Sequence, residues 1–276
     1  DAEDVVDLLS AAHAAPRGHV IGITGPPGVG KSTLINALIA LWRQSGRSVA
    51  VIAVDPSSRR SGGALLGDRT RLRTDPDDQN IFVRSMAARD RLGGLAGLTV
   101  AAMVLMRALY DMVLIETVGV GQSETDVVGV ADTVVFCVQP GSGDSLQFMK
   151  AGIAEIPHVV VVTKADMDQP AKRARADVLG ALSLAEREPG WEIPVLMVSS
   201  QRRDGVEELV AQLDRHYVWT SGTNRLAALR HSQAEQWLVE AVRERFGREG
   251  IKRAGDLSLS PDISPFRRLA ELSRRL

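Results

Sequence analysis

The alternation of apolar runs with helical patterns is the feature that most constrains the fold of this chain. Six runs rich in Val and Ile lack the period-two alternation of a half-exposed strand, so they are typical of strands covered on both faces. They span residues 19–24, 48–54, 112–116, 133–139, 158–163 and 194–199. Helical patterns lie between or after them at residues 31–44, 95–109, 144–155, 171–186 and 205–217. This order predicts an α/β fold with a doubly wound, mostly parallel sheet.

Composition narrows the class of partner and the compartment. The formal net charge is -1 over 276 residues, so we expect no nucleic-acid or membrane partner. No apolar stretch approaches the roughly 20 residues that span a bilayer, and the first residues are acidic where a signal peptide would be basic. The single cysteine, Cys137, lies in an apolar run and is interpreted as a core residue. We therefore expect a cytoplasmic protein, or the mature form of an organellar one.

A phosphate-binding loop follows the first predicted strand. The string matches G-x-x-x-x-G-K-[ST] and stands between a strand and a helix, as the mechanism of a P-loop requires. Glycines let backbone N–H groups turn toward the phosphates, Lys31 reaches the β- and γ-phosphates, and Ser32 offers its hydroxyl to Mg²⁺. The residues of the predicted loop and the start of its helix are Gly25, Pro26, Pro27, Gly28, Val29, Gly30, Lys31, Ser32 and Thr33.

Carboxylates follow two other predicted strands. Asp55 comes after the run at 48–54, and Glu116 ends the run at 112–116. Mg²⁺ bound to phosphates takes one or two carboxylates directly or through water. The spacing from Glu116 to Gly119 resembles the D-x-x-G switch of GTPases, in which the glycine N–H senses the γ-phosphate. We expect both acids near Mg²⁺, although a helix-capping role for Asp55 stays open.

The fifth apolar run leads into a string that resembles the guanine motif N-K-x-D. Asp166 would accept two hydrogen bonds from the base, and the stem of Lys164 would lie over it. Thr163 stands where Asn is usual, which leaves open how the phosphate loop is braced. After the sixth run, a serine element would offer a backbone N–H to the guanine oxygen. Its residues are Ser199, Ser200 and Gln201.

Several strings together resemble one family, the MeaB/ArgK-type GTPases. These are G-protein chaperones of adenosylcobalamin-dependent acyl-CoA mutases such as methylmalonyl-CoA mutase. The resemblance covers about residues 20–214, and the string at 116–124 is highly specific. The other matching strings span residues 55–58, 61–63, 66–71 and 140–144.

The resemblance implies a Mg²⁺-dependent GTPase that gates loading of adenosylcobalamin into its mutase and protects the cofactor there. It places Asp55, Asp68 and Glu116 around Mg²⁺, Arg71 in the first switch, and Lys150 in a third switch that contacts the mutase. A lysine or arginine brought to the γ-phosphate would offset transition-state charge. Adenosylcobalamin would reach the chain only through the mutase. The resemblance also implies a homodimer formed by the C-terminal helices.

The expected organisation has three parts. Residues 1–18 form an N-terminal helical segment, residues 19–220 form the P-loop GTPase domain, and residues 221–276 form a C-terminal helical extension. Within the extension, residues 225–245 are predicted to be one long helix and residues 266–276 a short amphipathic one. Two interpretations of the short helix stay open: it packs on its own domain, or it contacts a second subunit or a partner.

Three other functions are weighed against this one. A nickel-insertion accessory GTPase would need clustered His and Cys ligands, whereas the five histidines are scattered along the sequence. A P-loop kinase would need an acceptor site, and no string in the sequence resembles one. A nucleotide-gated binding module would show no stimulation of hydrolysis by a partner. The histidines in question are His13, His19, His158, His216 and His231.

Overall fold

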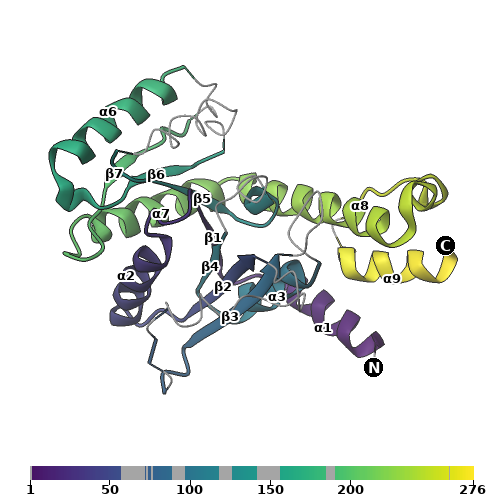
Figure 1. Cartoon of the computed structure of the whole chain (residues 1–276). Helices are drawn as coiled ribbons and strands as arrows, with labels where there is room; N and C mark the ends of the chain where they lie inside the picture. Colours follow the sequence, from purple (N-terminus) through teal and green to yellow (C-terminus); the bar gives the residue numbers. More distant parts are fainter. Residues whose placement is uncertain are drawn as a thin grey trace.

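A parallel sheet of seven strands forms the centre of the described structure (Figure 1). The computed structural model describes residues 2–56, 72, 74–75, 77–88, 97–117, 126–141, 156–184, 190–260 and 262–276. The strand order is β3-β2-β4-β1-β5-β6-β7, and every registered pair is parallel. The strands are β1 His19–Thr24, β2 Val49–Pro56, β3 Ile81–Ala88, β4 Met112–Glu116, β5 Thr133–Val138, β6 Val159–Val162 and β7 Val195–Met197.

The strand order changes direction at β1. From β1 the chain first builds β2, β3 and β4 on one side, and then β5, β6 and β7 on the other. In an open α/β sheet of this kind, ligands bind beyond the carboxyl ends of the strands at such a switch point. The predicted phosphate loop follows β1 directly, so the topology places it at that point.

The six predicted apolar runs are strands β1, β2, β4, β5, β6 and β7, which confirms the α/β fold. Strand β3 was not predicted. It pairs with β2 alone, at the edge of the sheet, and its described side chains are half-buried or exposed. Arg84 and Ser85 interrupt its apolar residues, so the sequence carries no continuous run there.

Helices cover both faces of the sheet because alternate strand residues point in opposite directions. Ile21 and Ile23 pack in one cluster with residues of α2 (Lys31–Gln44) and α7 (Val206–Ser221). Val20 belongs to the opposite cluster, with residues of α1 (Ala2–Ala14) and α3 (Gly97–Leu109). On that same face, Val160 packs with α6 (Gln169–Leu182). Two 3-10 turns, η1 (Val127–Gly129) and η3 (Ala165–Met167), lie in the connections.

The four predicted helices at 31–44, 95–109, 171–186 and 205–217 are present as α2, α3, α6 and α7, with ends shifted by up to four residues. The predicted helix at 144–155 lies outside the described residues. The long C-terminal helix is α8 (Arg225–Ala254), which extends beyond the prediction and contains a non-helical residue, Gly247, at φ 68°.

Helix α8 leads away from the sheet toward α9 (Pro265–Arg275), and α1 lies alongside α9 (Figure 1). Phe266 of α9 packs against Trp237 of α8, with ring centroids 4.7 Å apart, and against His13 of α1. The N-cap Ser264 shares a hydrogen bond of 2.6 Å with Ser10. The inner face of α9 thus packs on its own chain, as one of the two open interpretations expected.

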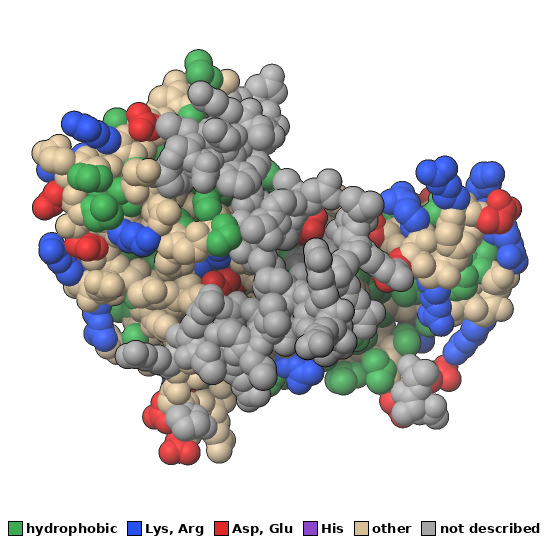
Figure 2. Space-filling view, viewed as in Figure 1, with side chains coloured by type: hydrophobic (Ala, Val, Ile, Leu, Met, Phe, Trp, Pro, Cys, Tyr) green, Lys and Arg blue, Asp and Glu red, His purple; other side chains and the backbone are tan. Residues whose placement is uncertain are grey.

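Charges of both signs lie together around α8 and α9 on the face drawn in Figure 2. Arginines of α9 form ion pairs with carboxylates of α1, Arg267 with Asp7 and Arg274 with Glu3. Among the described residues, no helix is long and apolar enough to cross a membrane.

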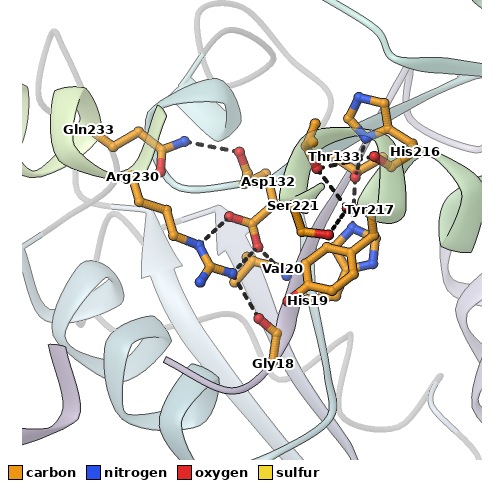
Figure 3. A network of polar contacts seen from close by, with 12 residues as sticks. Gly18, His19, Val20, Asp132, Thr133, His216, Tyr217, Ser221, Arg230 and Gln233 are labelled. Carbon is orange, nitrogen blue, oxygen red and sulfur yellow. Dashed lines mark hydrogen bonds and ion pairs between the residues drawn. The ribbon is translucent and has the colours of Figure 1, made fainter. Parts of the chain in front are cut away.

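An ion pair anchors α8 to the amino-terminal edge of the sheet (Figure 3). Arg230 of α8 donates to both carboxylate oxygens of Asp132, at 2.8 and 2.7 Å, and to the carbonyl of Gly18 at 2.9 Å. Asp132 also accepts the backbone N–H of Val20 at 2.8 Å. Gln233, one turn on, donates to two carbonyls of the segment before β5.

Candidate functional site

The segment between β1 and α2 has the backbone of a phosphate-binding loop. Gly25, Gly28 and Gly30 have φ values of 137°, 74° and 106°, which residues with a Cβ rarely adopt. A Cβ on Gly25 would also lie 2.4 Å from the carbonyl oxygen of Cys137, so β5 approaches the loop too closely for any other residue. Cys137 itself is buried, and burial raises the pKa of its thiol to about 12, in agreement with a core role.

Lys31 lies inside the loop at the first position of α2. Its side chain is buried, and its ammonium donates to the carbonyls of Gly25 at 2.8 Å and Pro26 at 3.2 Å. The charge is therefore held at the centre of the loop by backbone oxygens. Phosphate oxygens entering the loop would offer this ammonium stronger, charge-assisted hydrogen bonds.

Ser32 and Glu116 meet beside the loop. The Ser32 hydroxyl donates to Oε1 of Glu116 at 2.9 Å, although 84 residues separate them. Glu116 is buried at the end of β4, next to β1, and Thr117 is tied to β1 through Ile23 and Thr24. A hydroxyl and a carboxylate are hard oxygen donors of the kind that Mg²⁺ prefers. The pair therefore fits a magnesium site.

Thr163 braces the phosphate loop. Its buried hydroxyl lies 2.7 Å from the carbonyl oxygen of Val29 and 3.1 Å from that of Val138, and can donate to either. The first of these carbonyls belongs to the phosphate loop and the second to β5. The hydroxyl thus connects the segment predicted to recognise the base with the loop, a contact that Thr163 can make in place of the usual Asn.

Lys164 and Asp166 form a rim beside the phosphate loop. Lys164 has a left-handed backbone (φ 52°), and its exposed ammonium donates to the carbonyl of Gly28 at 3.0 Å and to Gln139 at 2.6 Å. Asp166 accepts the hydroxyl of Ser199 at 2.7 Å, and this hydrogen bond lowers the pKa of the carboxyl. The carboxylate is thus ionised at neutral pH and partly open to solvent, as an acceptor for a base would have to be.

The structure brings together part of the predicted site. The loop residues, Glu116, Thr163, Lys164, Asp166 and Ser199 are gathered at the carboxyl edge of the sheet. Ser200 and Gln201 follow in the turn after Ser199. Asp55 lies near the end of β2, the neighbour of β4, but its side chain is not described. Outside the described residues lie Asp68, Arg71, Gly119 and Lys150.

Sequence reasoning missed three residues of this site, which form two hydrogen bonds. Thr24 and Thr117 share a hydrogen bond of 3.0 Å at the ends of β1 and β4, and Gln139 receives the ammonium of Lys164. Each of these residues stands at or just after the end of a predicted strand, which is the signal that could have identified them.

Three of the histidines that are scattered in the sequence lie together in space, at the opposite edge of the sheet. The hydroxyl of Thr133 lies 2.6 Å from His19 and 2.7 Å from His216, and the rings of His158 and His216 are 4.4 Å apart. Within the described ranges, however, no group of three or more His, Cys, Asp or Glu side chains could hold a metal ion.

A family model matches almost the entire chain. Its description is "Methylmalonyl Co-A mutase-associated GTPase MeaB", and it matches residues 2–253. Curated relatives agree. A putative GTPase of Pyrococcus abyssi is 43% identical over 82% of this chain and 71% of its own length. GTPase ArgK of Escherichia coli is 36% identical over 81% of this chain and 69% of its own.

A mouse protein, described as a mitochondrial methylmalonic aciduria type A homolog, is 40% identical over 81% of this chain and 55% of its own length. Among solved structures, a LAO/AO transport system kinase superposes with a TM-score of 0.67 at 27% identity, over 99% of this chain and 92% of that one. HypB from Helicobacter pylori, in complex with nickel, gives a TM-score of 0.56 at 17% identity, over 78% and 96%. That second likeness concerns the fold alone.

Proposed function

The chain belongs to the MeaB family of methylmalonyl-CoA mutase-associated GTPases, and from that premise we propose that it couples Mg²⁺-dependent GTP hydrolysis to chaperoning of an adenosylcobalamin-dependent acyl-CoA mutase. The observation that carries the hydrolytic part is the Ser32–Glu116 hydrogen bond beside the phosphate loop. The observation that carries the mutase part is the family match over residues 2–253.

For the metal, we propose that Ser32 and Glu116 hold Mg²⁺, with Asp55 and Asp68 completing the set. Bound Mg²⁺ would neutralise charge that develops between the β- and γ-phosphates. Lys31, at the centre of the loop, would exchange the carbonyls of Gly25 and Pro26 for phosphate oxygens. The backbone N–H groups of residues 25–30 would bind the remaining phosphate oxygens.

For the base, we propose that Asp166 accepts hydrogen bonds from guanine, because its carboxylate is ionised, partly exposed and oriented by Ser199. The stem of Lys164 would lie over the base, since its ammonium is anchored to Gly28 on one side and Gln139 on the other. Thr163 would keep this segment at a fixed distance from the loop. The backbone of Ser200 and Gln201 would complete the base pocket.

For the coupling to a partner, we propose that Arg71, Gly119 and Lys150 belong to segments that respond to the γ-phosphate, as the family resemblance implies. Lys150 would reach the γ-phosphate when the mutase is bound, and the added positive charge would accelerate hydrolysis. The C-terminal helices α8 and α9 would form a homodimer contact through faces not used against α1. The compartment proposed is the cytoplasm, or the interior of an organelle.

The metal assignment is tested by Glu116→Gln. This change keeps an oxygen ligand but removes its charge, so we expect GTP still to bind while Mg²⁺-dependent phosphate release falls about 10²-fold or more. The matched control is Glu207→Gln, the same change on the exposed face of α7. Hydrolysis by Glu116→Gln at the wild-type rate would assign the metal carboxylate to Asp55 or Asp68 instead.

A further inference from the structure

A buried arginine that forms no ion pair with any described carboxylate lies far from the nucleotide loop, at the amino-terminal edge of the sheet. Arg107, in the last turn of α3, is 3% exposed. Its Nε has no hydrogen-bond partner, and within the described part of the chain no carboxylate forms an ion pair with it. Burial of an uncompensated charge costs several kcal/mol, so this arrangement calls for a ligand or another physical reason.

The carboxylate whose charge acts on Arg107 is already engaged. Asp132 is fully buried and accepts two hydrogen bonds from Arg230 and one from Val20, so little of its acceptor capacity remains for a second guanidinium. Burial, together with the positive charge of Arg230, lowers the pKa of Arg107 to about 10, which still leaves it charged at neutral pH. The carboxylate of Asp132 attracts both guanidinium groups but forms an ion pair only with that of Arg230, so Arg107 has no ion-pair partner of its own among the described residues.

A cavity opens beside this excess charge. It has a volume of about 780 Å³, within the range of small-molecule sites, and lies between α1, α3 and the junction of α7 with α8. Its described lining contains no Asp or Glu. Arg107 also lines a smaller cavity, whose other lining residues are mainly apolar ones of α3, α8 and α9. The polar residues around the larger one include His13, Arg107, Thr223, Asn224, Arg230 and His231.

The positive charge of Arg107 beside the cavity also acts on the imidazole of His13. Burial, and next the charge of Arg107, lower the pKa of His13 to about 4, so its ring is neutral at pH 7 and can donate or accept a hydrogen bond. Thr223 and Asn224 add uncharged polar groups at the start of α8. The cavity thus combines a guanidinium that needs an anion with neutral groups that could bind the rest of a molecule.

We propose that this cavity binds a small molecule through an oxyanion, a phosphate or a carboxylate, placed against the guanidinium of Arg107. A guanidinium donates two parallel hydrogen bonds to either group, which gives the site both affinity and orientation. The site lies across the sheet from the phosphate loop, because Arg230 and Asp132 surround the beginning of β1 and β5 whereas the loop follows the end of β1. It is thus separate from the nucleotide site.

The test uses the full chain saturated with Mg²⁺ and GDP, so that the nucleotide loop is already occupied. Inorganic phosphate and, separately, succinate are titrated against sodium chloride of matched ionic strength, and binding is followed by calorimetry and by Tm. Three variants are compared with wild type. Arg107→Met removes the charge, and Arg107→Lys keeps a positive charge without the planar guanidinium that donates two parallel hydrogen bonds. Arg43→Met is the control, because the guanidinium of Arg43 already donates to Asp78.

We expect one of the two anions to bind wild type and Arg43→Met alike and to raise their Tm. Binding should weaken about tenfold or more in Arg107→Met, and to a lesser degree in Arg107→Lys. Without anion, Arg107→Met should match or exceed the Tm of wild type, because it removes an unpaired buried charge. Phosphate binding would indicate a phosphoester ligand, and succinate binding a carboxylate. The proposal is overturned if neither anion binds, or if both Arg107 variants bind as well as wild type.

Discussion

A single hydroxyl group at Thr163 joins two parts of the site that are distant in the sequence. It lies within hydrogen-bonding distance of the carbonyls of Val29 and Val138 and can donate to either, and the next residues are those proposed to hold the base. The motif around it could be predicted, because strand ends and the order of the motifs are visible in the sequence. The contact itself could not, because it joins side chain and backbone across 134 residues.

At the residue scale, we also predict that Asp166→Asn shifts the preference of the site from guanine to xanthine nucleotides. The amide would donate to the xanthine carbonyl where the carboxylate accepted from guanine. GDP binding should therefore weaken by about 2 to 4 kcal/mol, while xanthosine diphosphate gains affinity. Calorimetric titration of both nucleotides measures the exchange.

Asp168→Asn is the matched control for that titration. It makes the same change two residues on, at an exposed position outside the proposed base contact. Unchanged GDP affinity in Asp166→Asn would show that another group recognises the base. Equal losses in both variants would indicate a general effect of charge in this turn.

At the scale of elements, Arg230 and Asp132 hold α8 against the sheet. Asp132 is fully buried and the side chain of Arg230 is 12% exposed, so removing the arginine would leave a buried carboxylate without its partner. We predict that Arg230→Met lowers the free energy of unfolding by about 3 to 5 kcal/mol. Urea denaturation followed by far-UV circular dichroism measures this change.

The comparison for this loss is Arg47→Met. Arg47 also forms a bidentate ion pair, donating to both carboxylate oxygens of Asp214, but both side chains are more than a third exposed. Its loss should cost at most about 1 kcal/mol. Similar effects of the two variants would mean that the buried pair is not what holds α8 in place.

Elements differ in how far the sequence determines them. The strands buried on both faces and the helices between them carry strong patterns, and all that lie within the described residues were predicted. Strand β3 lies at an edge, where packing constrains fewer side chains, and Arg84 breaks its apolar run. The packing of α9 against α1 could not be chosen from the sequence, because its partners lie more than 250 residues away.

At the scale of the molecule, four buried or half-buried histidines make stability depend on pH. Burial is the main cause that lowers the pKa of His13, His19 and His158 to about 4 and that of His216 to about 2. In the unfolded chain each would bind a proton near pH 6.5, whereas in the folded chain each stays neutral down to about pH 4 or below. The unfolded state binds more protons in this window, so the free energy of unfolding falls as pH decreases from 6.5 to 4.

We predict a decrease of up to about 1.4 kcal/mol per pH unit for each of the four histidines. His158→Asn keeps an acceptor for the N–H of Val134, which His158 now receives on Nδ1 at 2.9 Å, but removes the titrating ring. Chemical denaturation at several values between pH 7 and 4.5 should give a slope reduced by roughly a quarter. An unchanged slope in this variant would exclude His158 as a source of the pH dependence.

The most direct test of the proposed function concerns the molecule and its partner together. Single-turnover hydrolysis of GTP is measured with Mg²⁺ for the protein alone and with methylmalonyl-CoA mutase or a related acyl-CoA mutase. We predict slow hydrolysis alone and an increase of roughly 10³-fold or more with the cognate mutase. Most of that increase should be lost in Lys150→Ala and kept in the control Lys252→Ala, on the exposed surface of α8. Equal stimulation of Lys150→Ala would remove Lys150 from the mechanism, and no stimulation by any adenosylcobalamin-dependent acyl-CoA mutase would contradict the chaperone function itself.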